Sequence, residues 1–359
     1  MDRKSILRAP ALLLAAALAL CAAQLVVSSD LRAALDFISP NSLRGHVSFL
    51  ASDLLEGRST PSRGLDVAAE YIAAQFRRAA LEPAGEDGYF QAGSIAPSRR
   101  NPNPDAPPPE PVKLRNVIGI LRGSDPALQA TCVILSAHYD HLGMRETGEG
   151  DLIYNGADDN ASGVAAVLEI AAALARLGTR PKRSIVFMTF AGEEKGLLGS
   201  RYYAAHPVFP VEKTVAAINL EELGRTDDVS GPVLSTAYVT GFDYSDVGPI
   251  LESAGKLTGV TIAKHAENND RFFTGSDNVS LAAVGIPAHT LSVGFIFPDY
   301  HKVGDEWQKL DYDNMAKVVR AVALGVFMIA NGDEPPRWNP DTPRADRYRK
   351  VREAPPAAP

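Results

Sequence analysis

The chain has 359 residues, of which 45% are hydrophobic and 22% are charged, and its formal net charge is −7 at pH 7. This composition is typical of a globular protein with enough length to bury a large core. The acidic balance and the lack of a basic stripe argue against a nucleic-acid partner.

The first 28 residues predict an export signal. An apolar run at 9–27 follows three basic residues, Arg3, Lys4 and Arg8. This pattern suits a cleaved secretory signal peptide better than a transmembrane helix. We therefore expect a periplasmic or extracellular protein with no stable membrane partner beyond this segment. Cys21 only loosely resembles a lipoprotein acylation site, so a lipid anchor is the less favoured alternative.

Strands and helices are expected to alternate along most of the chain. The buried strands are predicted at Asn116–Leu121, Thr131–Ala137, Ser184–Phe190, Val215–Leu220 and Ala288–Val293. The helices are predicted at Leu43–Leu55, Gly64–Ala80, Ser162–Leu177, Lys195–Ala205, Asp246–Leu257 and Tyr312–Ile329. The alternation predicts an α/β fold with a mixed, largely parallel central sheet sandwiched by helices on both faces.

One domain, 29–330, is expected to carry the function. The segment 331–359 is rich in proline, arginine and aspartate, which predicts a loosely packed tail. Once the signal is removed, Cys132 is the only cysteine left, and its apolar surroundings predict a buried, inert thiol.

Polar residues gather where the predicted strands end, which is where sites form in a parallel sheet. His138 and Asp140 follow one strand, and their spacing in an extended chain would let Asp140 accept a hydrogen bond from the His138 ring. A surface loop with histidines is the alternative for this pair. The other such residues are Glu193, Glu194, Glu221, Glu222, Tyr300 and His301, and Asp158 in the segment before a predicted helix would join the same site.

Helix ends offer a simpler explanation for some of these acids. Asp158, Asp159 and Asn160 precede a helix and suit its N-terminus, as do Glu193 and Glu194. One site would, however, collect four carboxylates and two imidazoles, and such a set would be too costly without cations. Its members are His138, Asp158, Glu193, Glu194, Glu221 and His301. Because Zn²⁺ accepts both histidine nitrogen and carboxylate oxygen, the set predicts two divalent ions.

Six segments, in order, resemble the successive motifs of the dizinc aminopeptidase family, which includes bacterial leucyl aminopeptidases and is related to glutamate carboxypeptidase and transferrin receptor. They are HYDHLG, NGADDNASG, FAGEEKGLLGS, NLEELGR, TGSDNVSLAAVGIPAH and DYHKVGDEW. The resemblance extends over roughly 43–329 and implies a zinc exopeptidase fold with two Zn²⁺ per chain.

The resemblance also implies the metal ligands. His138 would bind the first ion, with Asp140 oriented behind it, and Asp158 would bridge both ions. Glu221 would complete the first ion in place of the usual aspartate, with a longer side chain and therefore a different reach. The second ion would be completed by Glu194 and His301, while Asp159 resembles a residue outside the ligand set.

Two further roles follow from the same resemblance. Glu193 would be the general base that takes a proton from the attacking water. Tyr300 would help to stabilise the oxyanion, as in the carboxypeptidase branch. The substrate would be a peptide with a free N-terminus, which either coordinates a metal or meets acids in the loop Glu146–Asp151, although a solvated loop is the favoured interpretation of those acids.

Three alternatives stay open at this point. A glutaminyl-cyclase-like acyltransferase shares the fold but uses one zinc ion, and a receptor-like domain is non-catalytic and loses ligands. A carboxypeptidase of the same family is the third. The presence of candidate ligands at all five positions argues against the first two. The sequence shows no obvious long inserted apical domain and no clear arginine patch for a substrate carboxylate, which argues against the third.

Overall fold

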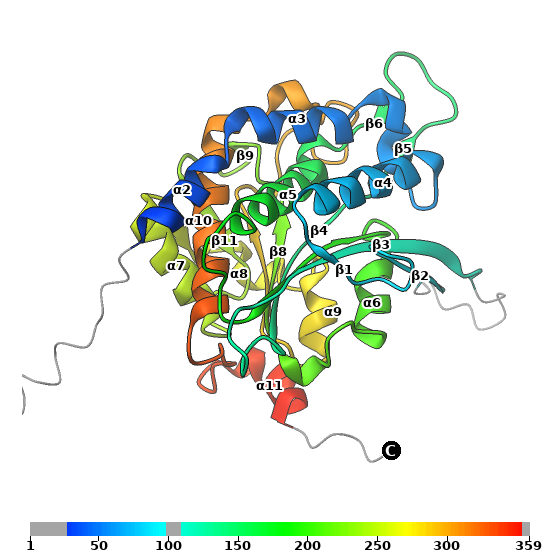
Figure 1. Ribbon diagram of the computed structural model, residues 1–359. Coiled ribbons are helices and arrows are strands. Elements are labelled where there is room, and N and C mark those ends of the chain that lie inside the picture. The colour runs from blue at the N-terminus through cyan, green and yellow to red at the C-terminus, as the bar shows by residue number, and fades with distance from the viewer. Residues whose placement is uncertain (1–26, 98–108, 354–359) are drawn as a thin grey trace, which may run out of the picture.

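The computed structural model describes residues 27–97 and 109–353 (Figure 1). The predicted signal segment therefore lies almost wholly outside the described residues. No helix in the described part of the chain is long and apolar enough to cross a membrane.

A nine-stranded sheet forms the centre of the molecule, in the order β1-β3-β7-β4-β8-β13-β11-β12, with β2 also paired to β3. Its strands are β1 (Glu82–Pro83), β2 (Phe90–Ile95), β3 (Val112–Leu121), β4 (Cys132–His138), β7 (Ser184–Phe190), β8 (Thr214–Glu221), β11 (Thr236–Val239), β12 (Thr261–Ala263) and β13 (Ala288–Ser292). Two short hairpins lie outside it: β5 (Gly143–Met144) with β6 (Ile153–Tyr154), and β9 (Asp227–Asp228) with β10 (Gly231–Pro232).

The four central strands are parallel neighbours. β4 pairs in parallel with β7 on one side and β8 on the other, and β8 pairs in parallel with β13. All residues of these four strands are buried, as expected for strands covered on both faces. The outer strands β3 and β11 run antiparallel to their inner neighbours, so the predicted mixed, largely parallel sheet is confirmed.

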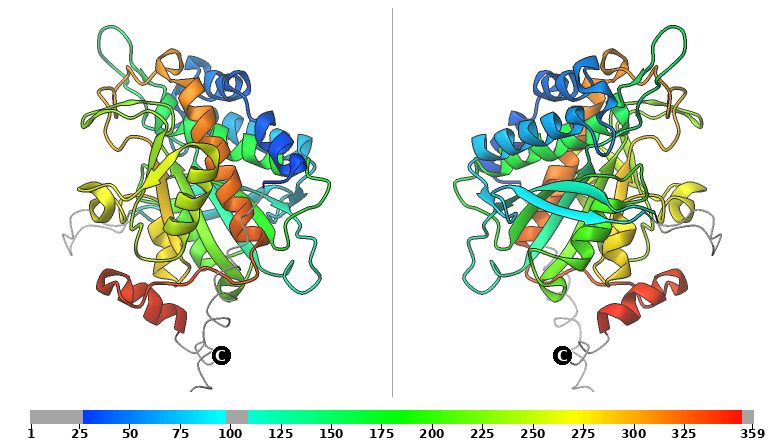
Figure 2. Two further views of the ribbon diagram at one scale, coloured as in Figure 1. Left: turned by 90° about the vertical axis from the view of Figure 1, so that its left-hand side faces the viewer. Right: turned by 90° about the vertical axis from the view of Figure 1, so that its right-hand side faces the viewer.

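Helices cover both faces of the sheet (Figures 1 and 2). One face carries the larger core, against helices α2 (Ser29–Phe37), α3 (Pro40–Leu50), α4 (Arg63–Arg78), α5 (Gly163–Leu174), α7 (Val247–Thr258) and α10 (Tyr312–Asn331). The opposite face carries α6 (Leu198–Ala205), α9 (Asn278–Ala283) and α11 (Asp346–Glu353). A short helix, α8 (Asn268–Arg271), follows β12.

The expected early helix ends sooner than predicted. It stops at Leu50, and a tight 3₁₀ segment (Asp53–Arg58) follows. Glu56, Gly57 and Arg58 have positive φ angles there, which no helix can continue through. The turn carries the Arg58 side chain into the interior, where it is 1% exposed.

The C-terminal segment, as far as it is described (331–353), is not the loose tail that its composition predicted. Trp338 and Tyr348 are buried and stack on each other with ring centroids 5.4 Å apart. The Trp338 indole also donates a hydrogen bond to the Gly285 carbonyl at 2.9 Å. Aromatic burial of this size outweighs the unfavourable composition around it. Cys132 is buried as expected, and burial raises the pKa of its thiol to about 12.

Candidate metal centre

The candidate residues lie at or after the carboxyl ends of the four central parallel strands. His138 is the last residue of β4 and Glu221 the last of β8. The pair Glu193–Glu194 follows β7, and His301 lies in the loop after β13. Because these strands are neighbours in register, their carboxyl ends meet at one place.

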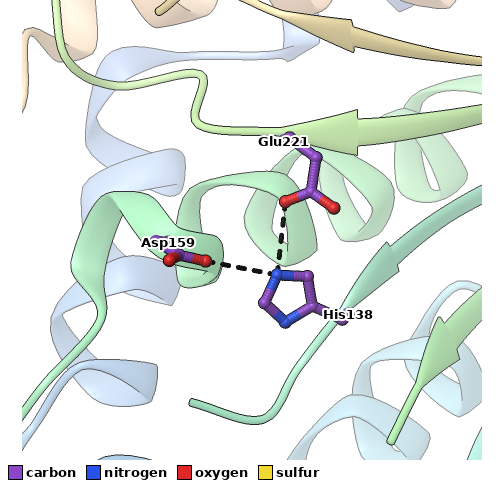
Figure 3. Close-up of side chains that lie close together, drawn as sticks. All are labelled: His138, Asp159 and Glu221. Carbon is purple, nitrogen blue, oxygen red and sulfur yellow. Dashed lines mark ion pairs between the residues drawn. The ribbon is translucent and has the colours of Figure 1, made fainter. Parts of the chain in front are cut away.

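The first cluster consists of His138, Asp159 and Glu221 (Figure 3). The His138 Nε2 atom lies 3.2 Å from Asp159 Oδ1 and 3.2 Å from Glu221 Oε2. Its Nδ1–H donates to the main-chain carbonyl of Asp140 at 3.1 Å, which leaves Nε2 directed at the carboxylates. The three donor atoms all lie within 4.8 Å of one another, so they can surround a single cation.

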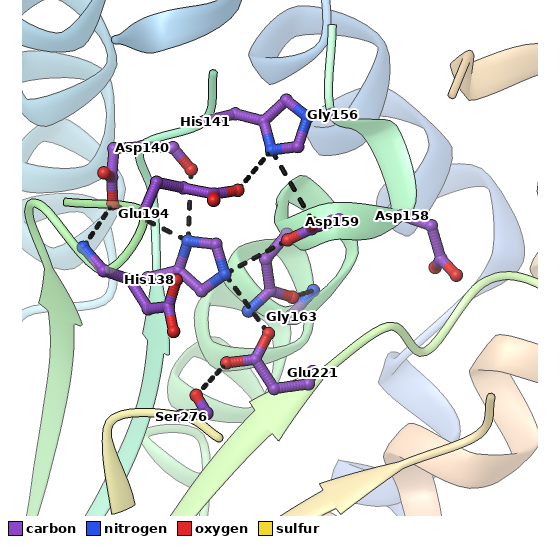
Figure 4. Close-up of polar contacts among 12 residues, drawn as sticks. His138, Asp140, His141, Gly156, Asp158, Asp159, Gly163, Glu194, Glu221 and Ser276 are labelled. Atoms are coloured by element: carbon purple, nitrogen blue, oxygen red, sulfur yellow. Dashed lines mark hydrogen bonds and ion pairs between the residues drawn. The ribbon is translucent and has the colours of Figure 1, made fainter. Parts of the chain in front are cut away.

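A second cluster lies beside the first and shares Asp159 with it. His301 Nε2 lies 3.0 Å from Asp159 Oδ2 and 3.5 Å from Glu194 Oε1. His141 Nδ1 lies 2.9 Å from the same Glu194 oxygen and 3.8 Å from Asp159 Oδ2 (Figure 4). The two oxygens of Asp159 therefore face different clusters, as expected of a carboxylate that bridges two cations.

The predicted bridging residue was Asp158, and the structure directs its side chain elsewhere. The Asp158 carboxylate accepts hydrogen bonds from the main-chain amides of Gly224 at 2.6 Å and Arg225 at 3.2 Å. In Figure 4 it points away from the histidines. Both aspartates belong to a single π-helical turn (Ala157–Ser162) before α5, and within it Asp159 has non-helical φ and ψ angles that direct its side chain into the site. Asp159, expected outside the ligand set, is thus the aspartate whose carboxylate lies between the two clusters.

The Asp140 carboxylate forms a hydrogen bond with the main chain of Glu193 and not with the His138 ring. Its Oδ1 accepts a hydrogen bond from the Glu193 main-chain amide at 3.1 Å, and its Oδ2 accepts one from Thr60 at 3.0 Å. The same Oδ1 lies 3.6 Å from His138 Nδ1, which is too long for a hydrogen bond. Asp140 therefore fixes the turn that presents Glu193 to the pocket.

Glu221 and Asp159 are held by residues that the motifs contain but that our sequence reasoning did not single out. The Glu221 Oε1 atom accepts hydrogen bonds from Ser276 at 2.5 Å and Asn219 at 3.0 Å. The main-chain amide of Asp159 donates to Asp305 at 3.0 Å. Ser276 lies in the TGSDN segment and Asp305 in VGDEW, so their place in the motifs was the available signal.

A buried guanidinium joins the two loops beneath the clusters. Arg58 donates to the carbonyls of Tyr139 at 2.9 Å, Asn155 at 2.7 Å and Gly156 at 3.0 Å. Burial lowers the pKa of Arg58 to about 10, so it stays charged at neutral pH. It fixes the end of β4 against the turn that carries Asp159 and adds a positive charge under an acidic site.

The clusters form the floor of a pocket of about 340 Å³. Glu193 and Glu222 line it, and neither side chain forms a hydrogen bond or ion pair with another described residue. Burial and the neighbouring carboxylates raise the pKa of both groups well above the ordinary value. Phe272 and Phe295, stacked 5.0 Å apart, form part of an apolar wall, and Tyr300 stacks on His301. No lysine or arginine is among the described residues that line this pocket.

Comparisons with known proteins agree with this architecture. The sequence profile of Peptidase family M28 matches residues 116–326, more than half of the chain. The chain belongs to peptidase family M28. This confirms the resemblance that the motifs indicated. A probable zinc metalloprotease of Pyrenophora teres f. teres is 28% identical over 338 residues, covering 87% of this chain and 69% of that protein.

Solved structures share the fold at low sequence identity. A zinc aminopeptidase from Bacillus subtilis superposes with a TM-score of 0.64 at 15% identity and covers 83% of this chain and 96% of its own. A glutaminyl cyclase of Porphyromonas gingivalis gives 0.58 at 18% identity and covers 79% and 96%, respectively. Because members with different reactions share this fold, the activity must be argued from the site.

Proposed function

We propose that this protein is an exported, zinc-dependent aminopeptidase that uses two metal ions. The observation that carries the proposal is the pair of histidine–carboxylate clusters sharing Asp159 at the floor of one acidic pocket. An aminopeptidase is a finer assignment than the family itself, and the pocket chemistry supports it as follows.

The donor set fits two zinc ions. The first would be held by His138, Asp159 and Glu221, and the second by Asp159, Glu194 and His301. Glu194 Oε1 is buried and has no hydrogen-bond partner among the described residues, although it faces two imidazoles. Such an atom is costly unless something else satisfies it, and a cation does so. Zn²⁺ suits mixed nitrogen and carboxylate donors at these spacings.

Bound zinc ions in such a centre polarise the scissile carbonyl and lower the pKa of water towards neutrality. The protein's own groups supply the rest of the chemistry. Glu193, unpaired and facing the pocket, takes a proton from the attacking water and delivers it to the leaving amine. Tyr300 donates a hydrogen bond to the developing oxyanion, and burial raises the pKa of its hydroxyl, which keeps it protonated.

The charge of the pocket favours a free amine over a free carboxylate in the substrate. Glu222 adds an unpaired acidic side chain beside the candidate carboxylate ligands, and the described lining contains no cationic side chain outside the histidines. A substrate ammonium group is attracted to such a surface, whereas a C-terminal carboxylate is repelled unless an arginine or lysine receives it. The loop acids Glu146, Glu149 and Asp151, considered earlier for this role, are exposed and do not line the pocket.

Peptide polarity gives the direct test. Zinc-loaded protein would be assayed on matched peptides with a free amine, an acetylated amine or an amidated C-terminus. We expect N-acetylation to suppress turnover strongly and amidation to have little effect. The opposite pattern would identify a carboxypeptidase, and cyclisation of N-terminal glutamine with release of ammonia would identify a cyclase. Export would be tested separately, by fractionating cells that express the full chain.

A further inference from the structure

We propose that His141 is a ligand of the second metal ion, in addition to Asp159, Glu194 and His301. This inference rests on the zinc centre of the proposed function. It makes the two positions unequal, because the second would have two imidazoles and two carboxylates, whereas the first would have one imidazole and two carboxylates.

The environment of His141 indicates an unmet partner. Its side chain is fully buried, and neither ring nitrogen has a hydrogen-bond partner among the described residues. The two buried histidines outside the clusters, His46 and His289, differ in this respect. Both ring nitrogens of His46 are bonded, to Tyr71 at 2.9 Å and Glu169 at 3.1 Å.

Both ring nitrogens of His289 have partners in the same way. Its Nε2 lies 2.6 Å from the Ser245 hydroxyl and its Nδ1 lies 2.9 Å from the Thr240 carbonyl. A buried imidazole without partners is therefore unusual within this protein as well as costly in general.

The ring of His141 is aimed at the second cluster. Donor atoms of His141, Asp159 and Glu194 all lie within 4.8 Å of one another, and Nδ1 is the nitrogen that faces the two carboxylates (Figure 4). Zinc ligands about 2.0–2.2 Å from the ion are separated by distances of this order. The ring also meets His301 edge to face, with centroids 5.8 Å apart.

The backbone around His141 leaves room for the ring in this place. Its main-chain amide donates to the Arg58 carbonyl at 3.2 Å. Gly156 packs against the ring so closely that a Cβ atom there would lie 2.5 Å from His141 Cγ, and its φ angle of +57° also favours glycine. A side chain at Gly156 would displace the imidazole from the cluster.

Four protein donors would close the second position, whereas three leave the first open to water and substrate. We therefore expect the second position to fill first and to exchange its ion more slowly. The competing role for His141 is that of an outer residue whose Nδ1–H donates to Glu194 and orients it. Such contacts change metal affinity by about 10–100-fold when they are lost.

Two substitutions separate these roles. His141→Ala removes both the proposed ligand atom and the 2.9 Å contact of Nδ1 with Glu194. His141→Asn places an amide nitrogen near the Nδ1 position, so it keeps a donor for Glu194 but offers a poor metal ligand. His46→Asn is the matched control, a buried histidine outside the pocket. Zinc affinity of each apo protein would be measured by competition with a chromophoric chelator.

We expect the wild-type protein to bind two ions with unequal affinity, and both His141 variants to lose more than about 100-fold at the tighter position. Near-normal affinity in His141→Asn would overturn the proposal in favour of the orienting role. X-ray absorption on the wild-type protein with one equivalent of zinc gives a test that needs no variant. Two imidazoles should surround the ion, and a single one would refute the ligand.

These results also separate failure of the inference from failure of the function. A folded wild-type protein that binds no zinc would remove the metal centre itself and the proposed function with it. Two tight ions in both wild-type and His141 variants would leave the aminopeptidase intact and reject only His141 as a ligand.

Discussion

Glu193 and Glu194 are adjacent and chemically identical, yet the structure gives them different surroundings. Glu194 Oε1 lies 2.9 Å from His141 and 3.5 Å from His301, in the second cluster. The Glu193 side chain lines the pocket without a hydrogen bond or ion pair to another described residue. Converting each to glutamine preserves shape and removes charge, so the pair separates metal binding from proton transfer.

The expected magnitudes differ accordingly. Loss of a general base lowers kcat by about 10²–10⁴-fold, which corresponds to about 2.7–5.4 kcal/mol in the activation free energy. Glu193→Gln should therefore be nearly inactive with a normal zinc content. Glu194→Gln replaces an anionic ligand by a neutral amide beside two imidazoles, so its zinc content should fall towards one ion per chain.

Metal analysis of dialysed protein, beside kcat and KM for a good peptide substrate, measures both effects. Glu146→Gln serves as the control, because Glu146 lies on an exposed loop outside the pocket. Loss of metal in Glu193→Gln with retention in Glu194→Gln would mean that the roles are reversed. Full activity in both variants would reduce the pair to a local structural feature and refute the mechanism.

Four further substitutions test other contacts. Ser276→Ala removes a 2.5 Å hydrogen bond to Glu221 and should weaken the first zinc ion by about 10–100-fold, measured by chelator competition. Asp159→Asn should lower zinc content at both positions, whereas Asp158→Asn should retain zinc and lower the thermal midpoint, because the Asp158 oxygens bind main-chain amides instead. Burial lowers the pKa of His289 to about 4 from 6.5, so the unfolded chain takes up a proton in this range that the folded chain excludes, and the free energy of unfolding should fall by about 3 kcal/mol as the pH drops from 6.5 to 4. The free energy of unfolding of His289→Gln, measured with urea at several pH values, should lack this decrease. The same pH dependence in the variant and the wild-type protein would show that His289 does not titrate in this way.

The central part of the fold could be predicted because its strands are long apolar runs with sharp ends. The predicted strand at Ser184–Phe190 matches β7 residue for residue, and the others differ by a few residues at their ends. The last two strands at one side of the sheet, β11 and β12, have four and three residues, too short for a period to emerge. The C-terminal segment was predicted to be loosely packed from its proline, arginine and aspartate content. That prediction gave no weight to two aromatic residues, Trp338 and Tyr348, that pack against α9 and its neighbours.

The sequence predicted which residues gather at the site better than it predicted where their side chains point. Strand order fixes which segments meet, so His138, Glu194, Glu221 and His301 lie together as expected. The direction of a side chain within a turn depends on backbone angles that spacing does not reveal. For that reason the bridging position was predicted for Asp158, whereas the carboxylate that lies between the clusters is that of Asp159.

The segment His138–His141 illustrates the same limit within one motif. Residues two apart point to the same side only while the chain stays extended, and β4 ends at His138. Beyond that residue the chain turns, so the Asp140 carboxylate bonds the Glu193 amide while His141, three residues after His138, faces the second cluster. In HYDHLG it is therefore the fourth residue, His141, and not the third, Asp140, whose side chain lies at the clusters with His138. His138 and His141 therefore face different clusters. The short turn at the end of β4 thus supplies one histidine to each cluster.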